Sequence, residues 1–199
     1  MTLILQMRTA LLILLLLSSF IPVVTGQVRV EMNNNKLYVN GKTLSDKPNK
    51  SELDSLIGEI STVHNITSSF NPVTKKTNPL NRQSFHFKSS GLWITYDSEE
   101  KKLYAIDLFI KSSNRNPEKD NLITFPNTYK DGLMLLDSTA TMDLVLQSIN
   151  KQAVQHIGTR PYAQRQILSI TYKKDDFYID LMFRADNRQM KQVYIRLVN

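Results

Sequence analysis

The feature that most constrains the fold is a set of segments in which apolar and polar residues alternate, separated by short polar turns. The turns 97–102, 173–176 and 185–188 consist mainly of charged and polar residues, as hairpin turns commonly do. Alternation with a period of two predicts strands that bury one face. The strands predicted around these turns are 84–88, 92–96, 103–111, 167–172, 177–184 and 189–198.

Two further pairs of short strands are predicted outside this set. A run of three Asn residues separates 28–32 from 36–40 and predicts a hairpin, because Asn tolerates the left-handed turn conformation. Strands are also predicted at 122–125 and 133–136, on either side of a turn that contains an Asp-Gly pair. These short strands are expected to join the same sheet as the longer ones.

The first helix is predicted directly after Asn49, whose side chain can cap it, with Glu52 placed to complete a capping box. Gly58 marks its end. The second helix is predicted to start at Thr139 or Thr141 and to end by 150 or run on to 158. The residues predicted to face the core are Leu53, Leu56, Ile57 and Ile60 in the first helix, and Val145, Leu146 and Ile149 in the second.

Two polar stretches interrupt these elements. The segment 61–81 is rich in Ser, Thr, Asn, Pro and Lys, and is predicted to be a long, mobile loop. The segment 112–121 is predicted to be a second polar linker.

The order of predicted elements repeats along the chain. An Arg-Gln pair at 82–83 and another at 165–166 each lead into strand, strand, polar turn and strand, and an Ile-Gly pair follows each helix. We predict an α+β fold: one domain of two similar β–α–β–β–β halves, about 27–111 and 122–199, sharing an antiparallel sheet of roughly eight strands with two helices packed on one face. The alternative is chance similarity between amphipathic strands.

The first 26 residues are predicted to be a cleavable secretory leader. Arg8 precedes an apolar run from 10 to 17, Pro22 breaks any helix, and small or modest residues lead up to Gly26. An uncleaved anchor is the alternative, although the apolar run is shorter than a spanning helix needs. We therefore expect a periplasmic or extracellular protein of residues 27–199 that does not span the membrane.

The absence of Cys and the net positive charge limit how the chain can be stabilised and which partners it can attract. The chain has no Cys, so neither a disulfide nor a lipid-bearing cysteine is expected, and stability must come from an apolar core. Loss of Arg8 with the leader lowers the formal net charge from +7 to +6. Such a charge favours anionic surfaces, although an ordinary soluble surface is the better explanation of it.

Short motifs resemble bacterial envelope proteins. The segment 41–58, with its turn, capped helix and Leu-Ile-Gly exit, resembles the helix-then-Gly motif of SmpA/OmlA-type assembly lipoproteins and of the tandem β-lactamase-inhibitor-protein fold. The segments 39–42 (VNGK) and 91–97 (GLWITYD) resemble uncharacterised secreted bacterial domains. The resemblance implies an α/β fold and an exported compartment, and no activity. The chain departs from the lipoproteins because no Cys follows the leader.

The residues that could carry chemistry are scattered. His64, His86 and His156 show no metal-ligand spacing, and the chain has neither a Gly-rich phosphate loop nor a Gly-x-Ser-x-Gly turn. We expect no catalytic residue, metal or cofactor, and therefore no enzyme. Nucleic-acid binding is not expected either, because the strand aromatics mostly face the core and the chain is exported.

What remains is a surface for binding. Alternation places two sets of residues on opposite faces of the sheet. The core face is predicted to hold Leu92, Ile94, Tyr96, Tyr104, Ile106, Leu108, Ile110, Phe177, Ile179, Leu181 and Phe183. The other face is predicted to hold His86, Trp93, Thr95, Leu103, Asp107, Phe109, Tyr178, Asp180 and Met182.

That second face is apolar enough to suggest either a contact surface or a covered one. If it is open, the predicted partner-binding residues are Trp93, His86, Asp107, Phe109 and Tyr178. If the first hairpin or the 61–81 loop covers it, Trp93 is an ordinary core residue. We expect a secreted, non-enzymatic protein that binds another protein or an anionic envelope surface. The alternatives are a small cell-envelope hydrolase and a purely structural envelope component.

Overall fold

The computed structural model describes most of the chain after the predicted leader. The described residues are 27–34, 36–45, 48–58, 60, 62–71, 75–100, 102–112, 123–162 and 165–198. The leader at 1–26 and nearly all of the 112–121 linker lie outside them. No helix within the described residues combines the length and apolar character needed to cross a membrane.

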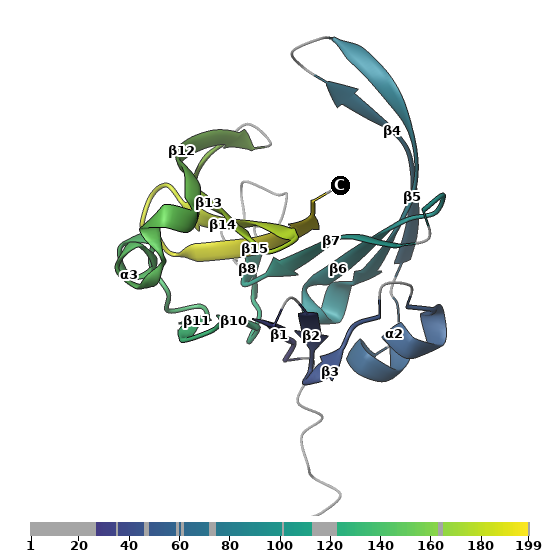
Figure 1. Cartoon of the computed structure of the whole chain (residues 1–199), viewed down its shortest axis with the longest axis horizontal. Coiled ribbons are helices and arrows are strands. Elements are labelled where there is room, and N and C mark those ends of the chain that lie inside the picture. The colour runs from purple at the N-terminus through teal and green to yellow at the C-terminus, as the bar shows by residue number, and fades with distance from the viewer. Residues whose placement is uncertain are drawn as a thin grey trace, which may run out of the picture.

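Eight strands form one antiparallel sheet, here called the large sheet (Figure 1). In spatial order they are β12 (Val154–Tyr162), β13 (Arg165–Lys174), β14 (Phe177–Arg184), β15 (Met190–Leu197), β7 (Lys102–Phe109), β6 (Leu92–Asp97), β5 (Lys76–Phe87) and β4 (Thr62–Asn71). This sheet and the two helices confirm the predicted α+β class.

Five shorter strands form a second sheet, here called the small sheet. Its strands, in order, are β11 (Met134–Leu136), β10 (Thr128–Asp131), β1 (Arg29–Asn33), β2 (Lys36–Val39) and β3 (Lys42–Thr43). The prediction that these segments join the large sheet was wrong. In addition β1 and β10 run parallel, a long-range pairing that no local pattern indicates. A third pair joins β8 (Lys111–Ser112) to β9 (Ile123–Thr124).

The large sheet is contributed equally by two parts of the chain. Strands β4 to β7 pair consecutively, strands β12 to β15 do the same, and the two groups meet where β7 pairs antiparallel with β15. In each part, short strands of the small sheet and one helix come before the group of four. That the halves arose by duplication stays a prediction.

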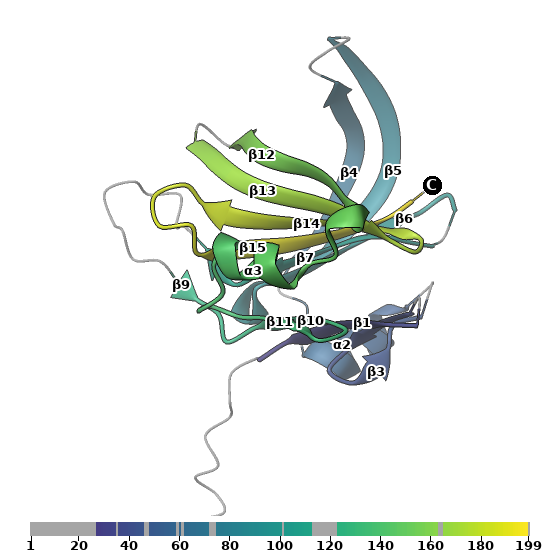
Figure 2. The ribbon, with the colours of Figure 1, turned by 60° about the vertical axis from the view of Figure 1, so that its left-hand side comes forward.

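One apolar core lies between the two sheets. The small sheet and helix α2 (Lys50–Ile57) lie on one face of the large sheet (Figures 1 and 2). Leu53 of α2 and Val145 of α3 (Met142–Ser148) both belong to this core. Burying the apolar faces of sheets and helices is the main favourable term in folding.

Polar groups connect the layers at two places. Tyr129 of the small sheet is fully buried, and its hydroxyl lies 3.1 Å from the hydroxyl of Tyr172 on β13. Asn127 is also fully buried; its side chain accepts a hydrogen bond from the backbone N–H of Val28 at 2.9 Å and donates to the carbonyls of Ser90 and Phe109 at 2.6 and 2.9 Å. Buried polar groups of this kind stabilise only when paired.

Both helices begin at the predicted caps. Asn49 Oδ1 accepts from the backbone N–H of Glu52 at 2.9 Å, and Thr141 Oγ1 accepts from that of Leu144 at 3.5 Å. Gly58, with φ of 110°, ends the first helix as predicted. The capping box is incomplete, because the Glu52 carboxylate instead accepts from the hydroxyl of Ser45 at 3.0 Å.

Two predictions about connections were wrong. Residues 62–71 and 76–81, predicted as a loop, form β4 and the first half of β5, which continues into the predicted strand at 84–88. Strand β11 pairs with β10 and not with the segment at 122–125. The second helix ends at Ser148, which confirms the shorter of its two predicted extents; after the short helix η2 (Lys151–Ala153) the chain forms β12, a strand that was not predicted.

Tight packing determines the connection between the short helix η1 (Lys88–Ser90) and β6. Gly91, which follows η1, has φ of 60°, and the Phe125 ring lies 2.7 Å from where its Cβ would be. Only glycine meets both requirements.

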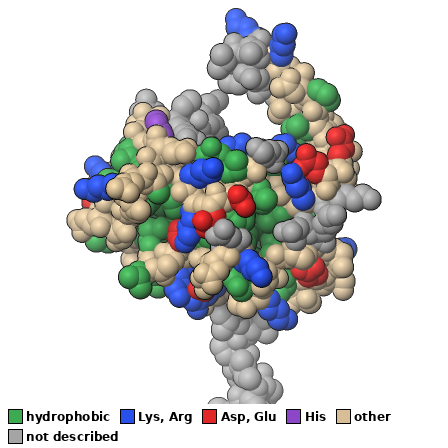
Figure 3. All heavy atoms as spheres, viewed as in Figure 1, with side chains coloured by type: hydrophobic (Ala, Val, Ile, Leu, Met, Phe, Trp, Pro, Cys, Tyr) green, Lys and Arg blue, Asp and Glu red, His purple; other side chains and the backbone are tan. Residues whose placement is uncertain are grey.

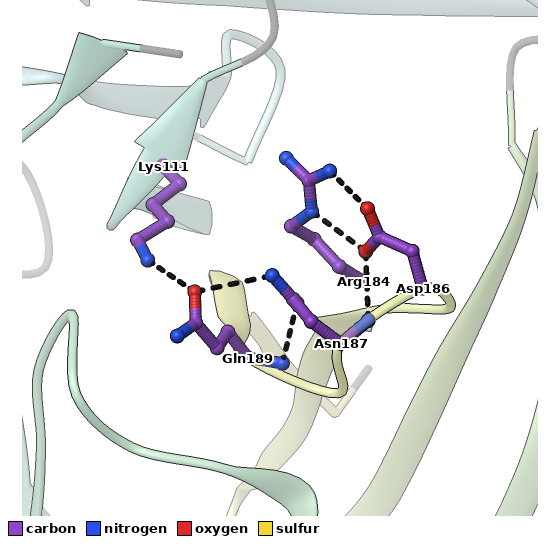
Figure 4. A network of polar contacts seen from close by, with 5 residues as sticks. All are labelled: Lys111, Arg184, Asp186, Asn187 and Gln189. Carbon is purple, nitrogen blue, oxygen red and sulfur yellow. Dashed lines mark hydrogen bonds and ion pairs between the residues drawn. The ribbon is translucent and has the colours of Figure 1, made fainter.

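The β14–β15 turn is held by a polar network (Figure 4): Lys111 Nζ donates to Gln189 Oε1 at 2.6 Å, and Arg184 pairs with Asp186. The first half of the chain thus fixes a turn in the second.

Candidate functional site

The candidate site is the face of the large sheet turned away from the core, here called the outer face. The first hairpin (β1 and β2) lies in the small sheet on the opposite side, and residues 62–71 extend the outer face as its edge strand. Neither of the two segments considered as covers therefore lies over Trp93. Both edges of the large sheet curve toward the same side, so the outer face is concave (Figures 1 and 2).

The predicted division of residues between the two faces is confirmed with one exception. Leu92, Ile94 and Ile106 are fully buried on the core face, as predicted. Leu103 and Tyr104 are exchanged, because the pairing of β6 with β7 shifts by one residue between Thr95 and Tyr96. A bulge of this kind turns the following side chains to the opposite face.

The exchange is visible in the surroundings of the two residues. Leu103 is buried opposite Tyr96. Tyr104 lies on the outer face, where the Arg82 guanidinium carbon is 3.4 Å from its ring centre. The predictions of Leu103 on the outer face and Tyr104 in the core were therefore wrong.

A run of four aromatic rings crosses the first half of the outer face, and we call it the ring stack: His64, His86, Trp93 and Phe109. His86 lies parallel to Trp93 with ring centres 4.1 Å apart, and His64 lies 4.3 Å from His86 on the other side. Phe109 contacts Trp93 edge to face at 4.7 Å. The rings come from β4, β5, β6 and β7, so strand pairing brings them together in order.

His86 is held neutral within the stack. Burial lowers its pKa to about 4, and the positive charges of His64 and Lys88 act in the same direction. Its Nε2 lies 3.1 Å from Ser84 Oγ, which also accepts a hydrogen bond from Thr95 Oγ1 at 3.1 Å. Near pH 7 the centre of the stack therefore carries no charge.

Asp107 lies beside the stack, directly opposite Trp93 on the neighbouring strand. Burial raises the pKa of its carboxyl to about 7, partly offset by a 2.6 Å hydrogen bond from Gln192 Nε2. On the next strand Tyr194 lies opposite Asp107, and burial raises the pKa of its hydroxyl. The carboxyl thus titrates near neutrality and can donate or accept a hydrogen bond.

Tyr178, the fifth predicted residue, lies apart from the stack on β14. Arg196 of β15 lies between, with its guanidinium carbon 5.3 Å from the Tyr178 ring centre, and Lys173 Nζ is 6.0 Å from that centre. In the neighbouring row Thr171 donates a short hydrogen bond to Asp180. The five predicted residues therefore share a face but form two clusters.

Three buried polar atoms on strands of this face have no hydrogen-bond partner in the part of the chain that the structure describes. They are Thr62 Oγ1, Ser169 Oγ and Gln192 Oε1, on strands β4, β13 and β15. Gln192 is 3% exposed and Ser169 is fully buried. An unpaired buried polar atom costs free energy unless something else satisfies it.

A second concavity lies at one end of the large sheet, between α3 and β12. Its volume is about 810 Å³, and it is lined by Leu146, Gln147, Ile149, Lys151, Val154, Gln155, His156 and Ile157. The lining offers one lysine and one histidine and no acidic residue. Within the described residues, no group of three or more His or acidic side chains is arranged to hold a metal ion.

Sequence reasoning missed His64 and Gln192. His64 was placed in a loop, and only the strand pairing of β4 with β5 brings its ring onto the stack. Gln192 was visible as a polar residue in a predicted strand, but its contact with Asp107 spans 85 residues. No local pattern indicates such a contact.

Known proteins resemble this chain only weakly. No model of a known protein family matches the chain, and no curated protein sequence matches it. A search of solved structures finds a cysteine-rich secretory protein from Staphylococcus aureus subsp. aureus Mu50, with a TM-score of 0.40 and 9% identity. The match covers 74% of this chain and 43% of the staphylococcal one, so the chain spans less than half of that protein. The resemblances to envelope proteins stated above stay predictions.

Proposed function

We propose that this chain is an exported, non-enzymatic binding protein whose concave outer face holds another protein. The observation that carries the proposal is the ring stack, with Asp107 and Gln192 beside it, on the face opposite the core. Aromatic side chains of this kind are preferred anchors in protein interfaces. The predicted leader at 1–26 would deliver the protein to the periplasm or outside the cell.

The stack is suited to binding because its rings already hold one another. His86 and Phe109 contact Trp93 from two sides, so the indole is held in one orientation before a partner arrives. A side chain that is ordered in advance loses less entropy on association. Partly exposed polar groups of the same face, Arg82 and Asp97 among them, supply hydrogen bonds that fix a partner's orientation.

The charges of the outer face favour a protein over an anionic polymer. Basic and acidic groups are interspersed: Arg82 pairs with Asp97 at 3.5 Å, and Arg196 lies one strand from Asp180. An anionic surface is best attracted by charges of one sign. A mixed surface complements a partner that also carries both signs.

One contact favours a hydrolytic function, and two observations argue against it. The 3.1 Å contact of Ser84 Oγ with His86 Nε2 has the geometry of a nucleophile and its base. Ser84 is only 4% exposed, however, and no acid among the described residues contacts His86 to orient it. We therefore favour binding.

Photo-crosslinking in the native compartment tests this proposal. A benzoylphenylalanine replaces His64, the exposed end of the ring stack, and in a matched control it replaces Leu135, which is 58% exposed on the small sheet. We expect one discrete adduct with a protein other than a second copy of this chain from position 64 and none from position 135. Adding Trp93→Ala removes the adduct, and Trp93→Phe restores it in part.

The same experiment separates the alternatives. Equal adducts from both positions, or retention on anionic envelopes with no adduct, would contradict the proposal in favour of a structural or surface-bound role. Turnover of a cell-wall or lipid substrate that His86→Ala abolishes would identify a hydrolase. Because Trp93 is the single tryptophan, its fluorescence reports whether the purified partner occupies the outer face.

A further inference from the structure

The edges of the two sheets differ in how they are protected against further pairing. An edge strand exposes unpaired N–H and C=O groups, and proteins limit this by short strands, charges, Pro or bulges. The small sheet ends in β3, with two residues, and β11, with three. At one edge of the large sheet, β12 contains Pro161, which has no N–H to donate, and an irregularity between Val154 and His156.

Strand β4, at the other edge, is long and carries little of this protection. It has ten residues, Thr62–Asn71, with no Asp, Glu, Lys, Arg or Pro, in a chain of which those four charged types make up 22%. Val63 is 49% exposed, and the side chains of Asn65 and Thr67 are exposed as well. Its one irregularity is a register shift between Ile66 and Ser68.

Within the described residues, the far part of this hairpin pairs with no third strand. Residues 82–86 of β5 pair with β6 on one side and β4 on the other, whereas 76–79 pair with β4 alone. The arm formed in this way stands clear of the body (Figures 1 and 3). A two-stranded ribbon with no packed face is marginally stable by itself, so an additional strand would stabilise it.

We propose that β4 pairs antiparallel with β4 of a second copy of this chain, which joins two large sheets into one continuous sheet. This inference does not depend on the proposed function, because it concerns the edge of the sheet and not its outer face. Backbone pairing supplies the attraction, as in other cases of strand addition.

The absence of Lys, Arg, Asp and Glu from β4 makes a second copy acceptable as the partner. Two copies that each carry +6 without the leader repel over most of their surface, but such a strand lets them approach. In a two-fold antiparallel arrangement centred near Ile66, residue 63 of one copy faces residue 69 of the other. Lys75 and Lys76 at the two arm tips then point to opposite ends of the interface.

Protection at the other edge explains why pairing would stop at two. A contact between β4 and β12 would be head-to-tail and would continue into fibres. Pro161 removes one ladder hydrogen bond from β12, whereas the two-fold β4–β4 contact uses up both unprotected edges and closes. The proposal therefore predicts a dimer with no larger species.

The first test compares two doubly charged variants of the exported protein by sedimentation equilibrium. Val63→Lys/Ser69→Lys places like charges opposite one another across the proposed interface. Asn78→Lys/Asn81→Lys adds the same charge at exposed positions of β5. We expect the dimer dissociation constant to rise about tenfold or more in the β4 variant, and to change much less in the β5 control.

The second test uses the absence of native cysteine. Single Cys residues are placed at 64, 65, 66, 67 and 68, with Asn78→Cys as the control. Facing residues in an antiparallel pair come close enough for a disulfide, so oxidation should link two copies at the position on the two-fold axis. A monomer at all concentrations, equal crosslinking at 78, or a β4 crosslink only to a different protein would each overturn the proposal.

Discussion

The two halves of the large sheet have the same arrangement of strands and different chemistry on the outer face. Strands β4 to β7 carry the ring stack, whereas β12 to β15 carry an acid–hydroxyl pair and a tyrosine flanked by Lys173 and Arg196. On the core face both halves are apolar. Packing against a shared core therefore constrains one face of each strand, and the other face is left to differ.

The edges of the two halves extend the comparison. The second half ends in edge strand β12, which contains Pro161. The first half ends in edge strand β4, which forms part of the free arm. The half with the ring stack is thus also the half with the unprotected edge. The predictions below test how far the halves act as one unit and where they differ.

The largest expected effect concerns the shared core. Phe183 of β14 is fully buried, so Phe183→Ala should lower the free energy of unfolding by about 3–5 kcal/mol. Val63→Ala in the free arm should change it by less than about 0.5 kcal/mol. Urea denaturation of both variants measures the difference, and a single transition for Phe183→Ala would show that the halves unfold together. Two separate transitions would contradict a common core.

The second effect is a pH dependence confined to the first half. Asp107 has a pKa near 7 when folded against 3.8 ordinarily, so the folded protein holds a proton between about pH 4 and 7 that the unfolded chain has lost. Raising the pH through that window lowers stability through Asp107. For His86, with a pKa near 4 against 6.5, the unfolded chain holds the extra proton, so raising the pH increases stability.

Single variants separate these opposing contributions. In Asp107→Asn the free energy of unfolding should rise more steeply from pH 4.5 to 7.5 than in the parent, and in His86→Gln it should fall. At about 1.4 kcal/mol per pKa unit, the Asp107 contribution amounts to a few kcal/mol, and that of the partly exposed His86 is smaller because solvent screens it. Denaturation curves across this range provide the measurement, and parallel pH profiles for all three proteins would contradict both shifts.

The third effect compares the helix that each half contributes. Asn49 caps α2 at 2.9 Å, whereas Thr141 caps α3 at 3.5 Å. Asn49→Ala should cost about 1 kcal/mol, within the usual range for such caps, and Thr141→Ala should cost less. Thermal unfolding of the two variants ranks them. A larger loss for Thr141→Ala would reverse the comparison.

The smallest effect compares one ring contact from each half. A double-mutant cycle on His86 and Trp93 should give a coupling energy of about 0.5–1.5 kcal/mol, as stacked aromatic pairs do. The same cycle on Tyr178 and Arg196, whose separation is larger, should give less than about 1 kcal/mol. Equal couplings would mean that the ring stack has no special rigidity.

Much of the interior could be predicted from the sequence. Burial of alternate residues in β14, from Phe177 to Phe183, follows the period-two pattern, and Asn49 and Gly58 mark the ends of α2. These features depend on contacts close in sequence or on the direct cost of exposing apolar surface. The candidate residues on the outer face could be assigned to that face for the same reason.

The sequence by itself determined the α+β class, the strands that cross the core and the face on which Trp93 lies. Only the tertiary structure decided the separation into two sheets, the bulge that exchanges Leu103 and Tyr104, and the edge strands β4 and β12. Central strands are specified by burial, which leaves a periodic pattern in the residues. Edge strands bury little and are formed mainly by backbone hydrogen bonds, which every residue except proline can make in the same way. Their sequences therefore resemble loops until a neighbouring strand is in place.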